Sequence, residues 1–118
     1  GRLANGLHYV IRPHGAQPGF FAAHLEVHVG SADEEPGMSG ICHLLEHVAF
    51  LGNFTREMLD EKGVQSNAYT DFNHTVFHAV SPVADSQGSP MLTPVLHMLS
   101  DVAFRPQLAS GRIDKERE

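Results

Sequence analysis

Apolar and polar residues alternate in several short runs of the chain, which is the pattern of strands with one packed face. The longest run is 20–30, where apolar residues hold the odd-numbered positions and two histidines and a glutamate lie between them. Shorter runs that are rich in aromatic and β-branched residues occur at 7–12, 66–70 and 75–80. We therefore expect four strands, the last two joined by a turn at 71–73.

A helical period of apolar residues replaces this alternation in three other segments, namely 39–52, 55–62 and 90–106. Ser39 and Thr55 are the expected N-caps of the first two helices, and Gly63 stands where the second should end. The third helix opens with a proline. Its expected apolar stripe is Leu92, Val95, Leu96, Leu99, Val102 and Ala103. A fourth helix should begin at residue 108. This order of elements predicts an α+β fold, with helices on one face of a mixed or antiparallel sheet.

Composition narrows the class of protein. The chain has 118 residues, 42% of them hydrophobic, which is enough apolar material for one folded domain. Its formal charge of −6 and the lack of a basic stripe argue against a nucleic-acid partner. No apolar run approaches the roughly 18 residues of a membrane span, and the lone Cys42 allows no internal disulfide. Because the chain lacks an initial methionine and stops within an expected helix, we expect a fragment of a longer protein.

The pattern with the most chemical content is His43-Leu44-Leu45-Glu46-His47, inside the first expected helix. At about 100° per residue, His47 lies about 40° around the axis from His43, and Glu46 about 60° in the other direction. All three polar side chains should then project from one side. The residues expected to pack away from that side are Ile41, Leu45 and Val48. Two imidazoles one turn apart can fill two corners of a zinc tetrahedron, and a neighbouring carboxylate can take a proton from a water that the metal activates.

Other arrangements of potential ligands are weaker. Nine histidines make a chance pattern a real alternative, with roughly 0.05 accidental matches expected, so a helix with surface histidines and a surface glutamate stays open. Cys42 lies about 100° from His43 and is better explained as a small buried apolar residue. His24 and His28 are about 13 Å apart along a strand, which is too far for one ion. The carboxylates of 33–37 are better explained as a solvated loop that favours the helix N-terminus.

Five stretches of the chain together resemble the zinc peptidases of the pitrilysin and insulin-degrading enzyme family, peptidase family M16, which carries an inverted H-x-x-E-H motif. They are 5–7, 27–31, 40–52, 66–70 and 115–117. The stretches HVAFLG and SNAYTDFNHTVFHAVSP are most similar to a chloroplast subfamily that processes precursor proteins. The resemblance implies that 1–118 is an incomplete N-terminal peptidase domain, and that a second homologous half-domain closes over the substrate.

The resemblance also implies roles for individual residues. His43 and His47 would bind one Zn²⁺ per active site, and Glu46 would be the general base. Glu116 would support the site without binding the metal, and the third ligand would be a glutamate beyond residue 118. One strand would pair with an extended substrate. Its substrate-binding residues would be Asn67, Ala68 and Tyr69.

The implied function is that of a zinc-dependent metalloendopeptidase acting on extended peptides or precursor transit peptides, with the chloroplast stroma as its location. Two alternatives stay open. One is a small-molecule metal lyase that shares the motif and takes its third ligand from a late cysteine, although the only cysteine here is Cys42. The other is an inactive core subunit of the same family, whose metal motif is typically eroded. Alone, residues 1–118 should bind zinc weakly and hydrolyse nothing, because a catalytic zinc normally needs three protein ligands.

Overall fold

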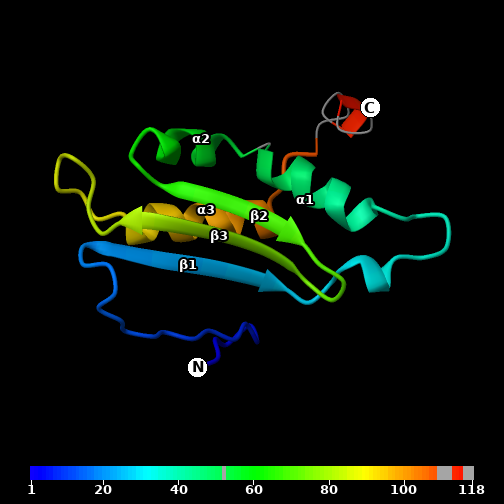
Figure 1. Ribbon diagram of the computed structural model, residues 1–118, viewed down its shortest axis with the longest axis horizontal. Helices are drawn as coiled ribbons and strands as arrows, with labels where there is room; N and C mark the ends of the chain where they lie inside the picture. Colours follow the sequence, from blue (N-terminus) through cyan, green and yellow to red (C-terminus); the bar gives the residue numbers. More distant parts are fainter. Residues whose placement is uncertain (52, 109–112, 116–118) are drawn as a thin grey trace.

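The computed structural model describes residues 1–51, 53–108 and 113–115 (Figure 1). The named elements of this part of the chain are strand β1 (Phe20–Val27), the 3₁₀ helix η1 (Ser31–Asp33), helix α1 (Ile41–Leu51), helix α2 (Phe54–Asp60), strand β2 (Gln65–Thr70), strand β3 (Thr75–Pro82) and helix α3 (Leu92–Phe104).

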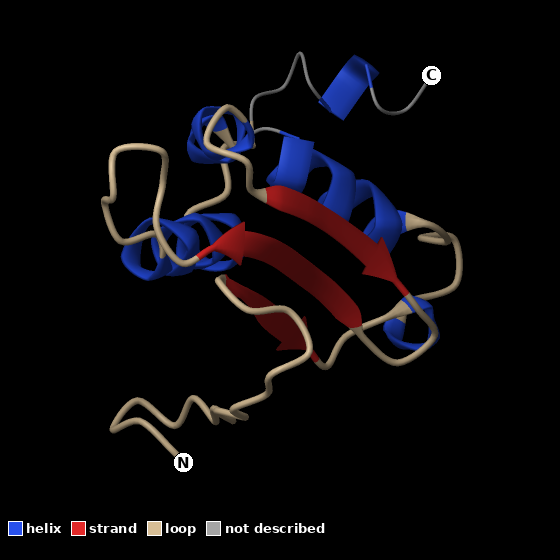
Figure 2. Cartoon of the chain, turned by 60° about the vertical axis from the view of Figure 1, so that its left-hand side comes forward, coloured by secondary structure: helices blue, strands red, loops and turns tan. Residues whose placement is uncertain are grey.

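The three strands form one antiparallel sheet in the order β1-β3-β2, so that β3 is central and the other two are edges. Burial follows this order: most of β3 is buried, whereas β1 and β2 alternate between exposed and half-buried residues. Figures 1 and 2 show the helices gathered on one face of the sheet. The predicted α+β architecture is confirmed, and the sheet is antiparallel in the part of the chain that the structure describes.

The hydrophobic core lies between the helices and the covered face of the sheet. On β1 the helix-facing residues are the odd-numbered ones expected from the sequence, and they pack against this core. The buried core residues are Phe50, Leu59, Val64, Phe77, Ala79, Met91, Val95, Met98, Leu99 and Val102. Removing such apolar surface from water stabilises the folded state by about 25 cal/mol per Å² of buried surface. The same packing holds α1 beside the edge strand β2.

The strand expected at 7–12 does not form, and this prediction is wrong. Among the described residues, the pairing found there is a single bridge between Arg2 and His8. Val10 and Ile11 are 91% and 82% exposed, although β-branched side chains favour strands. A strand needs a hydrogen-bonding neighbour as well as suitable side chains, and no strand of the described sheet pairs with this segment.

The N-terminus of α1 is capped by a side chain of the preceding loop, that of Glu34. The prediction that Ser39 is the N-cap is wrong. The Gly40 carbonyl accepts the first helical bond, from Leu44 N at 2.9 Å, and Gly40 has a φ of 86°. The Glu34 carboxylate accepts the N–H groups of Gly40 at 2.8 Å and of Cys42 at 2.9 Å. A carboxylate from the acidic loop thus satisfies helix donors that lack intrahelical partners.

Asn53, rather than Thr55, caps α2. The Asn53 side-chain oxygen accepts the Arg56 N–H at 3.0 Å, and Thr55 lies inside the helix. The turn after α2 closes at Gly63, as expected, with a φ of 85° and a bond from Gly63 N to the Asp60 carbonyl at 3.0 Å. Glycine is the residue best suited to this left-handed position.

The buried face of α3 is rotated from the expected stripe. Leu92 and Leu96 are 53% and 49% exposed, whereas Met91 and Met98 are buried. The buried residues of the helix are Val95, Met98, Leu99 and Val102. Methionine is unbranched and fills irregular gaps, and Met98, which the expected stripe left out, lies in the core. Further along, 113–115 is helical, and most of the fourth expected helix lies outside the described residues.

Candidate metal centre

Helix α1 brings His43, Glu46 and His47 together. Their ligand-type atoms lie within 4.8 Å of one another, and no other such group of three occurs in the described ranges. His43 Nε2 is 4.0 Å from Glu46 Oε2, and the two imidazole rings meet edge to face with centroids 4.5 Å apart. This proximity follows from the helix, on which residues three and four apart are neighbours. A pocket of about 160 Å³ lies at the histidines and is also lined by Gly40 and Leu44.

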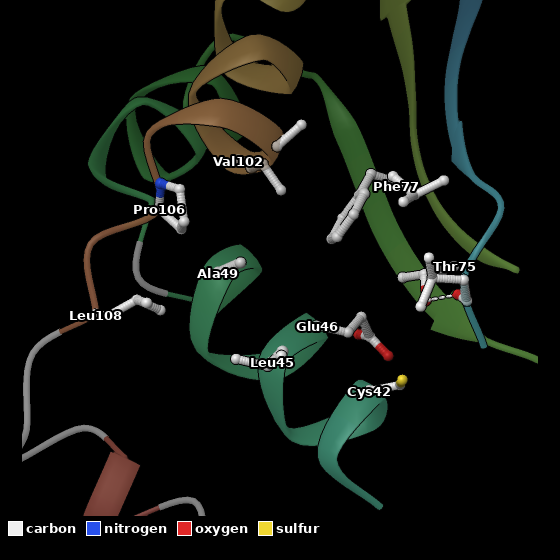
Figure 3. Close-up of a pocket in the computed structure, with 12 residues that line it drawn as sticks. Cys42, Leu45, Glu46, Ala49, Thr75, Phe77, Val102, Pro106 and Leu108 are labelled. Carbon is white, nitrogen blue, oxygen red and sulfur yellow. Dashed lines mark hydrogen bonds between the residues drawn. The ribbon is translucent and has the colours of Figure 1, made fainter. Parts of the chain in front are cut away.

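Glu46 does not share the exposure of the histidines. Its side chain is 6% exposed, whereas that of His43 is 65% exposed. Figure 3 shows the Glu46 carboxylate turned towards the sheet, at an apolar pocket of about 270 Å³ between α1, α3 and the strands. The three side chains converge on one side of α1, as expected, but Glu46 lies at the buried border of that side. The packing expected for Ile41 and Leu45 is wrong, because they are 38% and 47% exposed, whereas Val48 is buried as expected.

A carboxylate withdrawn from water needs a hydrogen-bond donor, and Glu46 finds one on β2. The Thr70 hydroxyl donates to Glu46 Oε2 at 3.2 Å. Thr75 lies opposite Thr70 in the sheet, donates to the Val29 carbonyl at 3.0 Å, and has its Oγ1 3.5 Å from that of Thr70. Sequence reasoning missed both threonines. The alternation along β2, with Ala68 facing the core, is the signal that could have placed Thr70 on the helix side.

The loop before α1 is tied to the turn between β2 and β3. Ser31 N–H donates to the Asp71 carbonyl at 3.0 Å, and Ala32 N–H donates to the Phe72 carbonyl at 2.9 Å. Gly30 is buried at this crossing, where a Cβ atom would lie 2.6 Å from the Phe72 oxygen. A glycine is required here because of the close approach of two backbones, and this approach positions the end of β2 relative to α1.

The acidic loop also sets the electrostatics at the start of α1. The backbone N–H groups of Cys42 and Gly40 hold the pKa of Glu34 below its ordinary value. Burial, together with the neighbouring Glu34, raises the pKa of the Cys42 thiol. This thiol donates to the Gly30 carbonyl at 3.4 Å and lies on the pocket side of α1 (Figure 3). Cys42 is therefore a half-buried packing residue, outside the histidine cluster.

Asn67, Ala68 and Tyr69 lie on β2, the sheet edge beside α1, and not in the cluster. The side chains of Asn67 and Tyr69 are exposed on the face away from the core. There the Tyr69 ring lies 6.2 Å from the ring of His74 and 6.5 Å from that of His78. The Ala68 N–H donates to Asn67 Oδ1 at 2.9 Å, so this backbone donor points to the free edge rather than to β3.

The donor set of the cluster fits a zinc ion. Imidazole nitrogens are common zinc ligands, and at Zn–N distances of about 2.0–2.1 Å two of them stand roughly 3.4 Å apart on a tetrahedron. This separation is compatible with ligand atoms that already lie within 4.8 Å of one another. The roles of His43 and His47 as ligands and of Glu46 as base stay predictions. Glu116 lies outside the described residues.

Comparison with known proteins shows the class. The family described as Insulinase (Peptidase family M16) matches residues 9–118, and the chain belongs to this family. The stromal processing peptidase of Pisum sativum, a chloroplast protein by its name, is 50% identical over 117 residues, which cover 99% of this chain and 9% of the pea protein. The probable zinc protease PqqL of Escherichia coli is 30% identical over 127 residues, covering 99% of this chain and 13% of that protein.

A solved structure supports the fold. The crystal structure of the periplasmic protease PqqL from Escherichia coli matches with a TM-score of 0.87 at 30% identity, covering 99% of this chain and 14% of that one. The predicted family and fold class are therefore confirmed. The chain spans about a tenth of the length of the curated relatives described above. Within the described residues, no helix combines the length and apolar character needed to cross a bilayer.

Proposed function

We propose that residues 1–118 are part of the N-terminal peptidase domain of a zinc-dependent metalloendopeptidase. The observation that carries this proposal is the convergence of His43, Glu46 and His47 on one helix of a peptidase M16 family member. His43 and His47 would hold the ion, which when bound supplies Lewis-acid activation of water and of the peptide carbonyl. The names of the relatives, a processing peptidase and a probable zinc protease, support this assignment.

Glu46 acts as the general base in this proposal. Its carboxylate takes a proton from the attacking water and passes it to the leaving amine. The Thr70 hydroxyl bonds to Glu46 Oε2 at 3.2 Å, and the same oxygen lies 4.0 Å from His43 Nε2. The base is therefore held beside the histidines before any substrate binds, which is the positioning that proton transfer requires.

We infer that the peptide substrate pairs with the free edge of β2. This strand is an edge of the sheet and lies beside α1. The outward Ala68 N–H is bonded to the Asn67 side chain, and a carbonyl of an extended peptide can replace that side chain as acceptor. Tyr69 follows on the same strand with an exposed ring that can contact substrate side chains. Main-chain pairing of this kind accepts many peptide sequences.

The complete active site needs groups that lie outside the described residues. We infer that a glutamate beyond residue 118 is the third ligand, that Glu116 supports the site, and that a second homologous half-domain closes over the peptide. By analogy with the pea relative, we assign the protein to the chloroplast stroma and its substrates to precursor transit peptides. Calorimetric zinc titration should show much weaker binding to residues 1–118 than to a longer chain that includes the glutamate. Equal, tight affinity would contradict this ligand assignment.

The alternatives have less support. A metal lyase would need a cysteine next to the histidines, but Cys42, the one cysteine of the chain, donates to the Gly30 carbonyl instead. An inactive core subunit would have no need for an intact cluster, and all three cluster residues are present in this chain.

The test uses the full-length protein that contains this chain. Glu46→Gln should keep one equivalent of zinc but lose about 10²- to 10⁴-fold in peptide hydrolysis, because it removes the base and leaves the ligands. His43→Ala should lose stoichiometric zinc. The matched control is His97→Ala, which removes an exposed helical histidine and should change neither property. Hydrolysis at the normal rate by Glu46→Gln, or a full equivalent of zinc in His43→Ala, would refute the proposal.

A further inference from the structure

The Glu46 carboxylate is held by a residue that is distant in sequence. The bond from Thr70 spans 24 positions of the chain and joins helix α1 to strand β2 at 3.2 Å. It falls on Oε2, the oxygen that lies 4.0 Å from His43 Nε2. The same carboxylate oxygen is therefore close both to a donor on the strand and to His43.

The surroundings of Glu46 offer poor substitutes for this donor. The pocket on the sheet side of α1 is lined mainly by apolar residues, and Thr75 and Cys42 supply its hydroxyl and thiol groups (Figure 3). Thr75 donates to the Val29 carbonyl at 3.0 Å, and Cys42 donates to the Gly30 carbonyl at 3.4 Å. Both donors are thus engaged elsewhere. A glutamate side chain that is desolvated without a donor would leave this position for water.

We propose that Thr70 is the positioning residue for Glu46, and that it couples the base to the strand that receives the substrate. The inference rests on the proposed function, in which Glu46 is the base and β2 binds the peptide. Thr70 is two positions from Ala68, whose N–H faces the free edge of β2. The same strand therefore presents a donor to the peptide and a hydroxyl to the base. Correct placement of β2 orients the carboxylate for proton transfer.

The experiment compares three substitutions of Thr70 in the full-length zinc protein. Thr70→Val keeps the shape and removes the hydroxyl, Thr70→Ala removes the whole group, and Thr70→Ser keeps the hydroxyl alone. A hydrogen bond to a charged group corresponds to about a 10- to 100-fold change. The valine and alanine variants should lose that factor in kcat, with KM within about threefold and one equivalent of zinc retained. The serine variant should stay within about threefold of the wild type in kcat.

Ser66→Ala is the matched control. Ser66 lies on β2 four positions before Thr70 and on the same half-buried face, and its buried hydroxyl has no hydrogen-bond partner among the described residues. Removing this hydroxyl should leave kcat and KM unchanged. A kcat loss equal to that of Thr70→Ala would mean that any hydroxyl lost from this face has the effect, which overturns the specific role of Thr70.

The outcomes separate this inference from the proposed function. Loss of hydrolysis in Glu46→Gln, with activity in the wild type, supports the function independently of Thr70. Equal kcat in Thr70→Ser and Thr70→Ala would then overturn the inference, as would a loss confined to KM. The comparison of Thr70→Ser with Thr70→Ala tests the role of the hydroxyl even if Thr70→Val does not fold. Serine and alanine are both smaller than threonine, so neither variant introduces a steric clash. A Glu46→Gln variant as active as the wild type would overturn the function and the inference together.

Discussion

Replacing Gly30 by alanine should destabilise the protein, because backbone atoms occupy the space that a methyl group needs. An ideal Cβ here would lie 2.6 Å from the Phe72 carbonyl oxygen, 2.7 Å from the His74 nitrogen, and closer still to the Asp71 carbonyl oxygen. None of these atoms is the end of a flexible side chain that could rotate away. The φ of Gly30 is −146°, which any residue can adopt, so the loss comes from space and not from backbone conformation.

Two estimates of the loss in the free energy of unfolding of Gly30→Ala agree. If the loop and the turn keep their places, the methyl group is overpacked at a cost of about 1–3 kcal/mol. If they separate, the bonds from Ser31 to Asp71 and from Ala32 to Phe72 are lost, at about 0.5–1.5 kcal/mol each. The free energy of unfolding should therefore fall by about 1–3 kcal/mol. For a domain of this size, Tm should fall by roughly 3–15 °C.

Urea unfolding followed by far-UV circular dichroism measures this loss, with Gly15→Ala as control. No described atom lies within 4 Å of the Cβ that Gly15 would gain. The free energy of unfolding of the control should therefore differ from that of the wild type by less than about 0.5 kcal/mol. An unchanged m-value would show that the midpoint reports stability. Should Gly30→Ala unfold at the same midpoint as Gly15→Ala, the close approach of the loop and the turn would be refuted.

The other predictions concern two helix caps and the free strand edge. Asn53→Ala should lower the free energy of unfolding by about 0.5–2 kcal/mol, because it removes the cap of α2; thermal unfolding checks this, and Thr55→Ala should cost less. The pKa of Glu34 is lowered in the folded state, so its contribution is present above about pH 4.3 and is lost as the pH falls through the folded pKa. Denaturation at a series of pH values should show Glu34→Gln and the wild type converging in acid, and a gap that widens there would contradict the cap. Ala68→Pro, placed in the inactive Glu46→Gln protein, should preserve the sheet because this N–H points away from β3. It should weaken peptide binding by about twofold to tenfold, and an unchanged dissociation constant would show that the peptide uses another edge.

Features with a local cause could be predicted from the order of residues. The alternation along β1, the helix that contains His43 and His47, and the glycine stop at Gly63 each depend on interactions over a few residues. The α+β class follows from the strand and helix periods of the apolar residues. The H-x-x-E-H motif is a run of consecutive residues, so it can be recognised in the sequence. The family resemblance, confirmed by the match over 9–118, follows from the amino-acid sequence alone.

Features that depend on distant segments needed the folded structure. The cap of α1 comes from Glu34 in a loop, and the donor to Glu46 comes from Thr70, 24 positions away. The packing of α1 beside β2 turns Glu46 inward, while the apolar pair Val10 and Ile11 stays exposed because no described strand pairs with it. A pattern shows which side of an element is apolar, but not which neighbour covers it. The candidate base was therefore visible in the sequence, whereas its burial and its hydrogen-bond donor depend on how helix and strand meet.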